Sequence, residues 1–148
     1  MLRMYLLVAR ARCLSPDAYQ SWYRQLLDHF FFDCERLMDV NHDLSSKTVR
    51  QRFLKDLFVQ WRGVVAAYDE GIARGDAVLG SAVWRNLYKA RSDVDFRRVA
   101  GVVSYIRGTL WDLERKTNGD LMTGRGLFKG SLEAHMRAVE AQVKPKNA

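Results

Sequence analysis

The fold is decided by the stretch KTVRQRFLKDLFVQWRGVVAAYDEGIAR, which occupies residues 47–74. Its large apolar side chains recur every three or four residues, which is the period of an α-helix. This stripe consists of Phe53, Leu57, Trp61, Val64 and Tyr68. Neighbouring apolar residues widen the stripe to an arc of about 140°, so we expect this helix to be central. Ser45 or Ser46 is suited to cap its start.

One flank of the same helix carries Gly63, Ala67 and Gly71 at successive steps of four. Small residues in such a row allow another helix backbone to approach closely, which offsets the low helix propensity of glycine. The alternative is that the glycines mark a fraying helix end, and it suits Gly71 but not Gly63. We therefore expect close helix packing along this flank.

On the N-terminal side, Ser15-Pro16-Asp17 has the pattern of a helix start. The apolar stripe that follows runs to about Met38 and is broken by Asn41-His42-Asp43. The preceding residues 1–13 are apolar, contain three arginines and have no acid, so they fit either the first helix or a short targeting presequence. We favour the helix, and the chain is then a piece of a longer precursor.

On the C-terminal side, Gly75-Asp76 predicts a corner in which the glycine ends one helix and the aspartate caps the next. A helix to about Leu87, a loop near residues 91–93 and a helix over 95–117 follow, and Asn118-Gly119 is expected to end the last of these. The apolar seam of that helix comprises Phe96, Val99, Val103, Ile106, Leu110 and Leu113. After a glycine-rich loop, Ser131 caps a final helix that runs to Val143.

The composition agrees with a folded helical chain. The 148 residues include 48% hydrophobic and 28% charged side chains, only two prolines and ten glycines. We predict an all-α, single-domain helical bundle of five to six helices over residues 1–143, with a polar tail over 144–148. Cys13 and Cys34 are expected to be buried, reduced thiols. No run approaches the roughly 20 apolar residues of a membrane span.

The sequence contains no motif that predicts catalysis or a cofactor. His29, His42 and His135 form no helical zinc pair, and neither a nucleotide-binding loop nor a dinucleotide fingerprint is present. Asp69 and Glu70 are adjacent on a helix and so diverge by about 100°. Asp69, Arg62 and Arg107 border apolar stripes, where they fit ion pairs between helices or a binding surface. We therefore expect no enzyme, no cofactor and no metal.

Several segments resemble a known family. The most specific are Gln60-Trp61-Arg62-Gly63, Ala67-Tyr68-Asp69-Glu70-Gly71, Gly75-Asp76-Ala77-Val78-Leu79 and Val83-Trp84-Arg85-Asn86-Leu87. Together with residues 6–12 and 103–107, they resemble the ubiquinol–cytochrome c chaperone family, the assembly factors for cytochrome b of respiratory complex III. The resemblance covers about residues 1–128, and residues 26–32 are most similar to the fungal mitochondrial members.

The resemblance implies a helical protein on the matrix side of the mitochondrial inner membrane. It implies binding to newly made cytochrome b, a heterodimer with a small partner assembly factor, and contact with the mitochondrial ribosome near its tunnel exit. Peripheral association with the inner membrane fits the same picture. The family defines no catalytic residue.

Two sets of residues are candidates for binding. The candidate partner-binding residues belong to the family-like block and are Arg62, Asp69, Glu70, Asp76, Trp84, Arg85 and Asn86. Helical geometry puts Arg98, Tyr105 and Lys116 opposite the apolar seam of their helix, where they form either a candidate basic surface or an ordinary solvated face. Consecutive aromatic residues such as Phe30, Phe31 and Phe32 indicate either a helix buried on most sides or a groove for a hydrophobic client.

Three functions are therefore compared. The first is an assembly chaperone that covers an apolar client without nucleotide or metal. The second is a basic helical module that binds RNA or the ribosome through phosphate contacts, since the net charge is +7. The third is an enzyme that uses Asp69 or Glu70, which the absence of a partner base disfavours.

Overall fold

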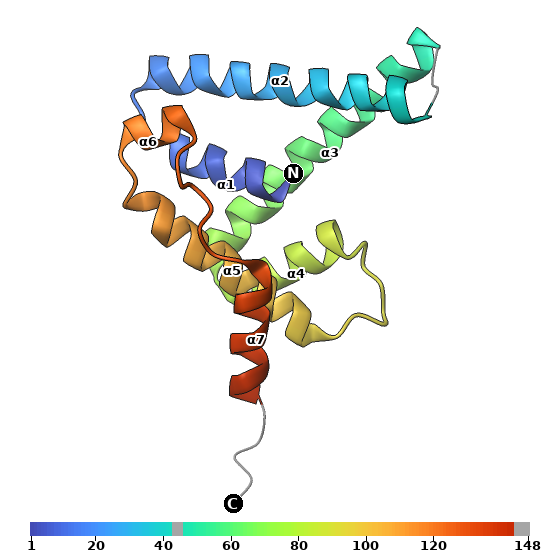
Figure 1. Ribbon diagram of the computed structural model, residues 1–148. Coiled ribbons are helices and arrows are strands. Elements are labelled where there is room, and N and C mark those ends of the chain that lie inside the picture. Colours follow the sequence, from blue (N-terminus) through green and yellow to red (C-terminus); the bar gives the residue numbers. More distant parts are fainter. Residues whose placement is uncertain (43–45, 144–148) are drawn as a thin grey trace, which may run out of the picture.

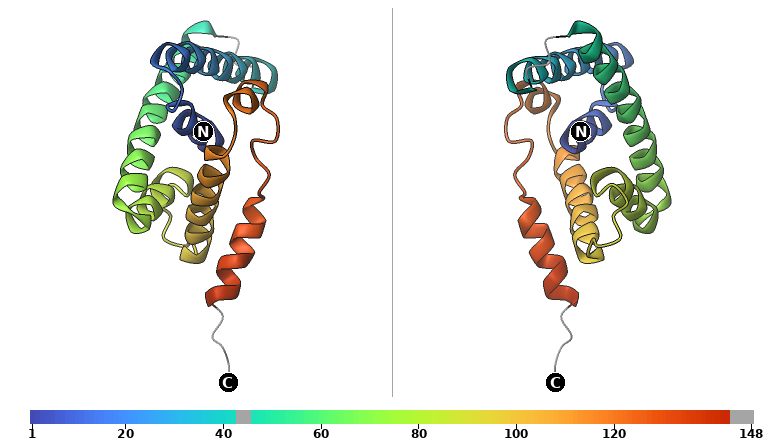
Figure 2. Two further views of the ribbon diagram at one scale, coloured as in Figure 1. Left: turned by 90° about the vertical axis from the view of Figure 1, so that its left-hand side faces the viewer. Right: turned by 90° about the vertical axis from the view of Figure 1, so that its right-hand side faces the viewer.

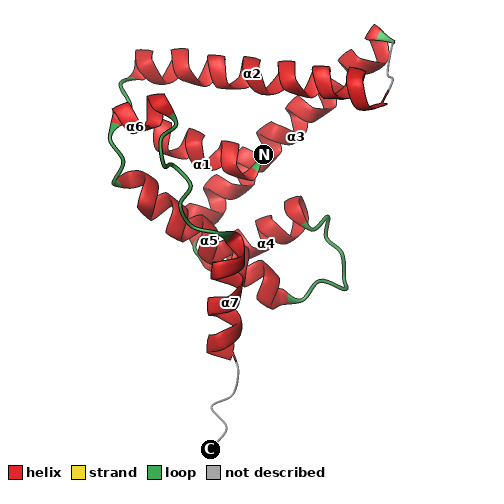
Figure 3. Ribbon diagram, in the orientation of Figure 1, coloured by secondary structure: helices red, strands yellow, loops and turns green. Residues whose placement is uncertain are grey.

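The structure is a computed structural model that describes residues 1–42 and 46–143, and within these the chain forms seven helices and no strand (Figures 1 and 3). The helices are α1 (Leu2–Ala11), α2 (Pro16–His42), α3 (Lys47–Arg74), α4 (Asp76–Leu87), α5 (Phe96–Glu114), α6 (Asn118–Thr123) and α7 (Leu132–Val143). The all-α prediction is confirmed. Ser45, Asp43 and the predicted polar tail 144–148 lie outside the described residues.

The seventh helix arises where the sequence predicted an end. Asn118-Gly119 does not terminate a helix but opens α6, because Thr117 forms a capping box with Asp120. The Thr117 hydroxyl accepts from the Asp120 amide, and the Asp120 carboxylate accepts from the Thr117 amide, each at 3.1 Å. Thr117 thus belongs to the start of α6 and not to the end of α5.

Other boundaries agree more closely with the sequence. Helix α3 has the predicted bounds, and Ser46 is its N-cap residue, although its side chain makes no capping hydrogen bond. Helix α2 continues past Met38 to His42. At the corner, Gly75 and not Asp76 is the N-cap of α4, and its φ of +108° requires a glycine.

Helix α1 forms the centre of the core, and α2, α3 and α5 surround it (Figures 1 and 2). Tyr5 and Leu6 are buried, and the Tyr5 ring meets the Tyr68 ring edge-on with the centroids 5.1 Å apart. Trp61 is also buried, and its indole N–H donates to the Tyr23 hydroxyl at 3.2 Å. The predicted first helix is therefore a core element of this fold.

The far end of the α2–α3 hairpin projects away from this core (Figure 1). Phe32 and Phe53 are 66% and 52% exposed, whereas Trp61 and Tyr68 further along α3 are buried. The prediction that α3 is central thus holds for its second half, and the exposed Phe32 excludes a helix α2 buried on most sides. No helix among the described residues is long and apolar enough to cross a membrane.

Two sequence expectations about small residues and thiols are wrong in detail. Helices α3 and α4 approach each other closely at Gly71 and not at Gly63. A Cβ on Gly71 would lie 2.6 Å from the Leu79 Cα of α4. A Cβ on Gly63 would have none of the described atoms of neighbouring elements within 4 Å. Cys13 is exposed and Cys34 half-buried, because α1 ends at Ala11 before Cys13 and α2 is covered on one side only.

Candidate partner-binding site

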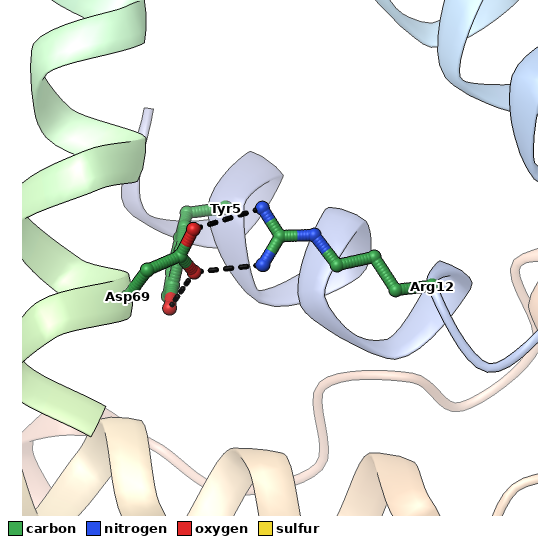
Figure 4. Close-up of polar contacts among 3 residues, drawn as sticks. All are labelled: Tyr5, Arg12 and Asp69. Carbon is green, nitrogen blue, oxygen red and sulfur yellow. Dashed lines mark hydrogen bonds and ion pairs between the residues drawn. The ribbon is translucent and has the colours of Figure 1, made fainter. Parts of the chain in front are cut away.

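Asp69 closes α1 onto α3 through three hydrogen bonds (Figure 4). The Arg12 guanidinium donates to both carboxylate oxygens at 2.7 and 3.0 Å, and the Tyr5 hydroxyl donates to Oδ1 at 3.0 Å. Burial, together with the negative charge of Asp69, raises the pKa of the Tyr5 hydroxyl. The hydrogen bonds to Asp69 raise the pKa of Arg12. Of the two interpretations offered above, Asp69 therefore fits an ion pair between helices at the edge of the core.

Asp76 and Arg107 form the second such link. The Arg107 Nε donates to the Asp76 carboxylate at 2.9 Å, and its two terminal nitrogens lie 3.3 and 3.4 Å from the carbonyl oxygen of Ile72. Arg107 of α5 is thereby joined to the last turn of α3 and the first turn of α4. A cation at the end of a helix is favourable because the last carbonyls carry partial negative charge.

Trp84 is fixed by the turn that ends α4. Its indole N–H donates to the Arg91 carbonyl at 2.8 Å, and its own carbonyl accepts from the Ala90 amide at 3.1 Å. Lys89 and Ala90 both have φ of +54°, a left-handed conformation that is costly for residues with a side chain. The bonds to Trp84 thus hold a strained turn and a large aromatic ring in one place.

The remaining residues of the predicted block point elsewhere. Glu70 pairs with Arg74 on the exposed surface of α3, at 3.1 Å. The Asn86 amide donates to the Ala82 carbonyl within α4, at 2.8 Å. Arg62 and Arg85 are exposed on α3 and α4. The block is thus not one continuous site.

Asp76 and Trp84 do come together, along one groove between α4, α5 and α7 with a volume of about 680 Å³. The α4 wall of the groove carries Ala77, Gly80 and Ser81 beside Trp84. Its floor is formed by α5, where Ala100, Ser104 and Gly108 recur every four residues. His135 of α7 forms the third wall. We call this the α4–α5–α7 groove.

Helix α7 reaches this position because α5 carries glycines under it. A Cβ on Gly101 would lie 2.7 Å from Met136 Cγ, and one on Gly108 would lie 2.7 Å from His135 Cε1. The Ser104 hydroxyl lies 2.9 Å from His135 Nδ1. The predicted cap of α7 is confirmed, since the Ser131 hydroxyl accepts from the Ala134 amide at 3.1 Å.

The candidate basic surface is divided by the same helix. Arg98 is exposed and Lys116 is half-buried, but Tyr105 is only 3% exposed. Its ring meets the His135 ring edge-on with the centroids 5.8 Å apart. Helix α7 packs on the face of α5 that the sequence assigned to solvent. Tyr105 therefore does not belong to a surface, and the prediction is wrong for this residue.

Two features of the site were not identified from the sequence. Arg10 of α1 donates to the carbonyls of Leu113 and Lys116 at 3.0 and 2.8 Å, so it caps the C-terminal end of α5. Gly101 and Gly108 seat α7, and their spacing of seven residues on one helix face was the available signal. No group of three or more metal-binding side chains occurs among the described residues.

The chain belongs to the ubiquinol–cytochrome c chaperone family, whose sequence profile matches residues 1–128. It is similar to protein CBP3, mitochondrial, of Saccharomyces cerevisiae, with 33% identity over 127 residues that cover 86% of this chain and 38% of the yeast protein. It is also similar to the ubiquinol–cytochrome c reductase complex assembly factor 1 of Xenopus laevis, with 32% identity over 51% of this chain and 38% of that protein. The factor of the same name in Drosophila melanogaster is 36% identical over 42% of this chain and 23% of its own length.

The chain therefore spans less than two fifths of the length of these relatives. No solved structure matches it.

Proposed function

We propose that this chain is an assembly chaperone that binds newly synthesised cytochrome b, together with a small partner factor, during biogenesis of ubiquinol–cytochrome c reductase. The observation that carries the proposal is the family match over residues 1–128, which includes six of the seven helices. The names of the relatives in frog and fly describe assembly factors of this reductase complex. The yeast relative is named as mitochondrial, which supports a mitochondrial location for this chain. Within mitochondria, we propose the matrix side of the inner membrane.

The surface supports a protein that binds by covering apolar groups. Large apolar side chains are exposed both on the α2–α3 hairpin and beside the α4–α5–α7 groove, where Phe96 is 73% exposed. Apolar patches at the surface of a folded protein mark sites for protein or membrane partners. The acidic side chains Asp69 and Asp76 are paired with Arg12, which follows α1, and with Arg107 of α5, an arrangement that serves packing.

The net charge of +7 suits further contacts with anionic partners. We propose that it serves binding to the mitochondrial ribosome near its tunnel exit and peripheral association with the inner membrane. The alternative function, an RNA- or ribosome-binding module without a client, loses support because Tyr105, one of the three residues of the candidate basic surface, is buried.

The proposal is tested by affinity purification of the tagged chain from its own cells or organelles, with crosslinking and mass spectrometry. We expect recovery of cytochrome b and one small protein, with crosslinks close to residues 76–108. A Lys116→Glu variant should retain the client while it loses ribosomal material. Recovery of RNA and ribosomal proteins alone, with a steep salt dependence, would instead establish the basic module.

A further inference from the structure

One face of α5, half-buried at Ser104 and Arg107, forms the floor of a long and mostly apolar channel. Phe96, Ala100, Ser104, Arg107 and Trp111 lie on this face at steps of three or four residues. From Phe96 to Trp111 the helix rises about 22 Å, which is the length of about four helical turns. Arg107 lines both the α4–α5–α7 groove and a second hollow of about 550 Å³ that contains Trp111. The two hollows therefore adjoin at the Arg107 side chain, which is bonded to Asp76 and to the Ile72 carbonyl.

The middle of the channel is built from small side chains and its ends from large ones. Ala77, Ser81 and Ala100 are all exposed along the groove. These small side chains leave the space of the groove unfilled. Phe96 and Trp111 at the two ends are 73% and 57% exposed. Small residues between two aromatic rings leave room for the large apolar side chains of another helix.

The charge around the Phe96 end identifies the kind of helix. Residues 85–98 contain five basic side chains, at positions 85, 89, 91, 97 and 98, against two acidic ones, at 93 and 95, a net charge of +3. Asp93 is already paired with Arg91, and the Asp95 side chain accepts from the Arg97 amide as the cap of α5. Arg85, Lys89 and Arg97 are exposed. Arg85 and Arg97 adjoin the groove residues Trp84 and Phe96 in the sequence, and Lys89 lies in the turn that follows Trp84. Acidic side chains on a ligand would be attracted to this end.

We propose that the α4–α5–α7 groove seats one helix of a partner protein, about four turns long, with large apolar side chains towards Ala100 and acidic side chains beside Arg85, Lys89 and Arg97. The inference rests on the proposed function, in which a bound partner protein supplies the helix. It adds to that function the place of binding and the chemistry of the ligand. Helix-in-groove recognition uses apolar side chains at i, i+3, i+4 and i+7, which matches the repeat along α5.

The probe is a pair of synthetic 18-residue helical peptides that share one leucine face. One peptide carries glutamates at the end that meets Arg97, and the other carries lysines there. Binding to the whole 148-residue chain is measured by fluorescence anisotropy. We expect the glutamate peptide to bind at least tenfold more tightly than the lysine peptide. Equal affinities would overturn the proposed ligand chemistry.

Ala100→Trp is the blocking variant, because Ala100 is exposed and its added ring occupies the groove without entering the core. The matched control is Ala66→Trp, the same change at an exposed alanine on the outer face of α3. We expect Ala100→Trp to weaken binding of the glutamate peptide at least tenfold and Ala66→Trp to leave it unchanged. Thermal unfolding of both variants establishes that each is folded. If folded Ala100→Trp binds like the unsubstituted chain, the groove is not the site.

A separate measurement distinguishes this inference from the proposed function. The tagged Ala100→Trp chain is purified with crosslinking beside the unsubstituted chain. Loss of cytochrome b or of the small partner with Ala100→Trp, and not with Ala66→Trp, supports the groove. Full recovery of both with Ala100→Trp overturns the groove and leaves the chaperone function intact. Failure of the unsubstituted chain to recover either protein overturns the proposed function itself.

Discussion

The close contact between α3 and α4 predicts opposite effects for one substitution at two sites on the same helix. A Cβ on Gly71 would lie 2.6 Å from the Leu79 Cα and 2.9 Å from the Leu79 Cβ, where ordinary contacts begin at 3.4 Å. The Leu79 Cα is a backbone atom, so it cannot move aside as a flexible side chain would. Only Gly75 separates α3 from α4. Gly71→Ala must therefore push the two helices apart. The same change at Gly63 meets none of the described atoms within 4 Å.

The magnitudes follow from two opposing effects. Overpacking of a tight site costs about 1–3 kcal/mol, and we take about 3 kcal/mol because the contact is with backbone. Alanine in place of glycine within a helix contributes about 1 kcal/mol of stability. Gly71→Ala should therefore lower the free energy of unfolding by about 2 kcal/mol, or roughly 4–8 °C in Tm, at about 2–4 °C per kcal/mol for a chain of this size. Gly63→Ala should raise Tm by about 2–4 °C, because only the propensity gain applies.

Both variants are measured by thermal and urea unfolding with circular dichroism at 222 nm. The urea experiment gives the free energy of unfolding, and an unchanged denaturant slope would establish that the native state remains compact. The reasoning is refuted if Gly71→Ala is as stable as Gly63→Ala, or if both variants shift in the same direction.

Three further predictions concern stability. Arg10→Ala should lower the free energy of unfolding by about 2–3 kcal/mol, since it removes charged hydrogen bonds to the end of α5. As a control, Arg24→Ala at an exposed position should change the free energy of unfolding by less than about 0.5 kcal/mol. Equal urea midpoints for the two variants would contradict the capping role of Arg10. Burial raises the pKa of Tyr68 to about 12, above its value of about 10 in the unfolded chain. The stability contributed by the neutral phenol is therefore complete below about pH 10 and is lost as the pH rises from about 10 towards 12. Between about pH 10 and 12, the urea midpoint should fall less in Tyr68→Phe than in the unsubstituted chain. If both proteins lose stability equally over this range, groups other than Tyr68 cause the loss. Asp95→Ala should cost about 1 kcal/mol, measured as a lower Tm, because its carboxylate caps α5; no change in Tm would exclude the cap.

The helices were predictable where local sequence signals agree. Helix α3 has a long apolar stripe, a serine before it and a glycine after it, and its predicted bounds match the structure. The Thr-x-x-Asp pattern of the capping box at Thr117 is present in the sequence, but Asn118-Gly119 directly after Thr117 is also a common signal for a helix end. Local patterns thus predict the helices when a start signal and an end signal do not overlap. Where they overlap, as at Thr117, the signal that forms more hydrogen bonds decides the structure.

The candidate site was predictable only in part, because its contacts join residues far apart in the sequence. Asp69 borders an apolar stripe, as the pattern indicates, but its partner Arg12 is 57 positions away. Tyr105 lies opposite the seam of α5, as helical periodicity requires, yet α7 covers that face. A single helix pattern assigns faces, while the neighbours that cover those faces follow from tertiary packing.

Helix α7 also has a consequence for how binding specificity can diverge among related proteins. It begins at Leu132, beyond the family match that ends at residue 128, and it packs chiefly on α5. Substitutions on its outer faces leave the core around α1 untouched, so we expect them to be tolerated better than changes in α3 or α5. Under the proposed binding mode, side chains of α7 beside the groove that do not contact α5 can therefore change with little effect on the core. A new partner helix can be accommodated by exchange of a single peripheral segment.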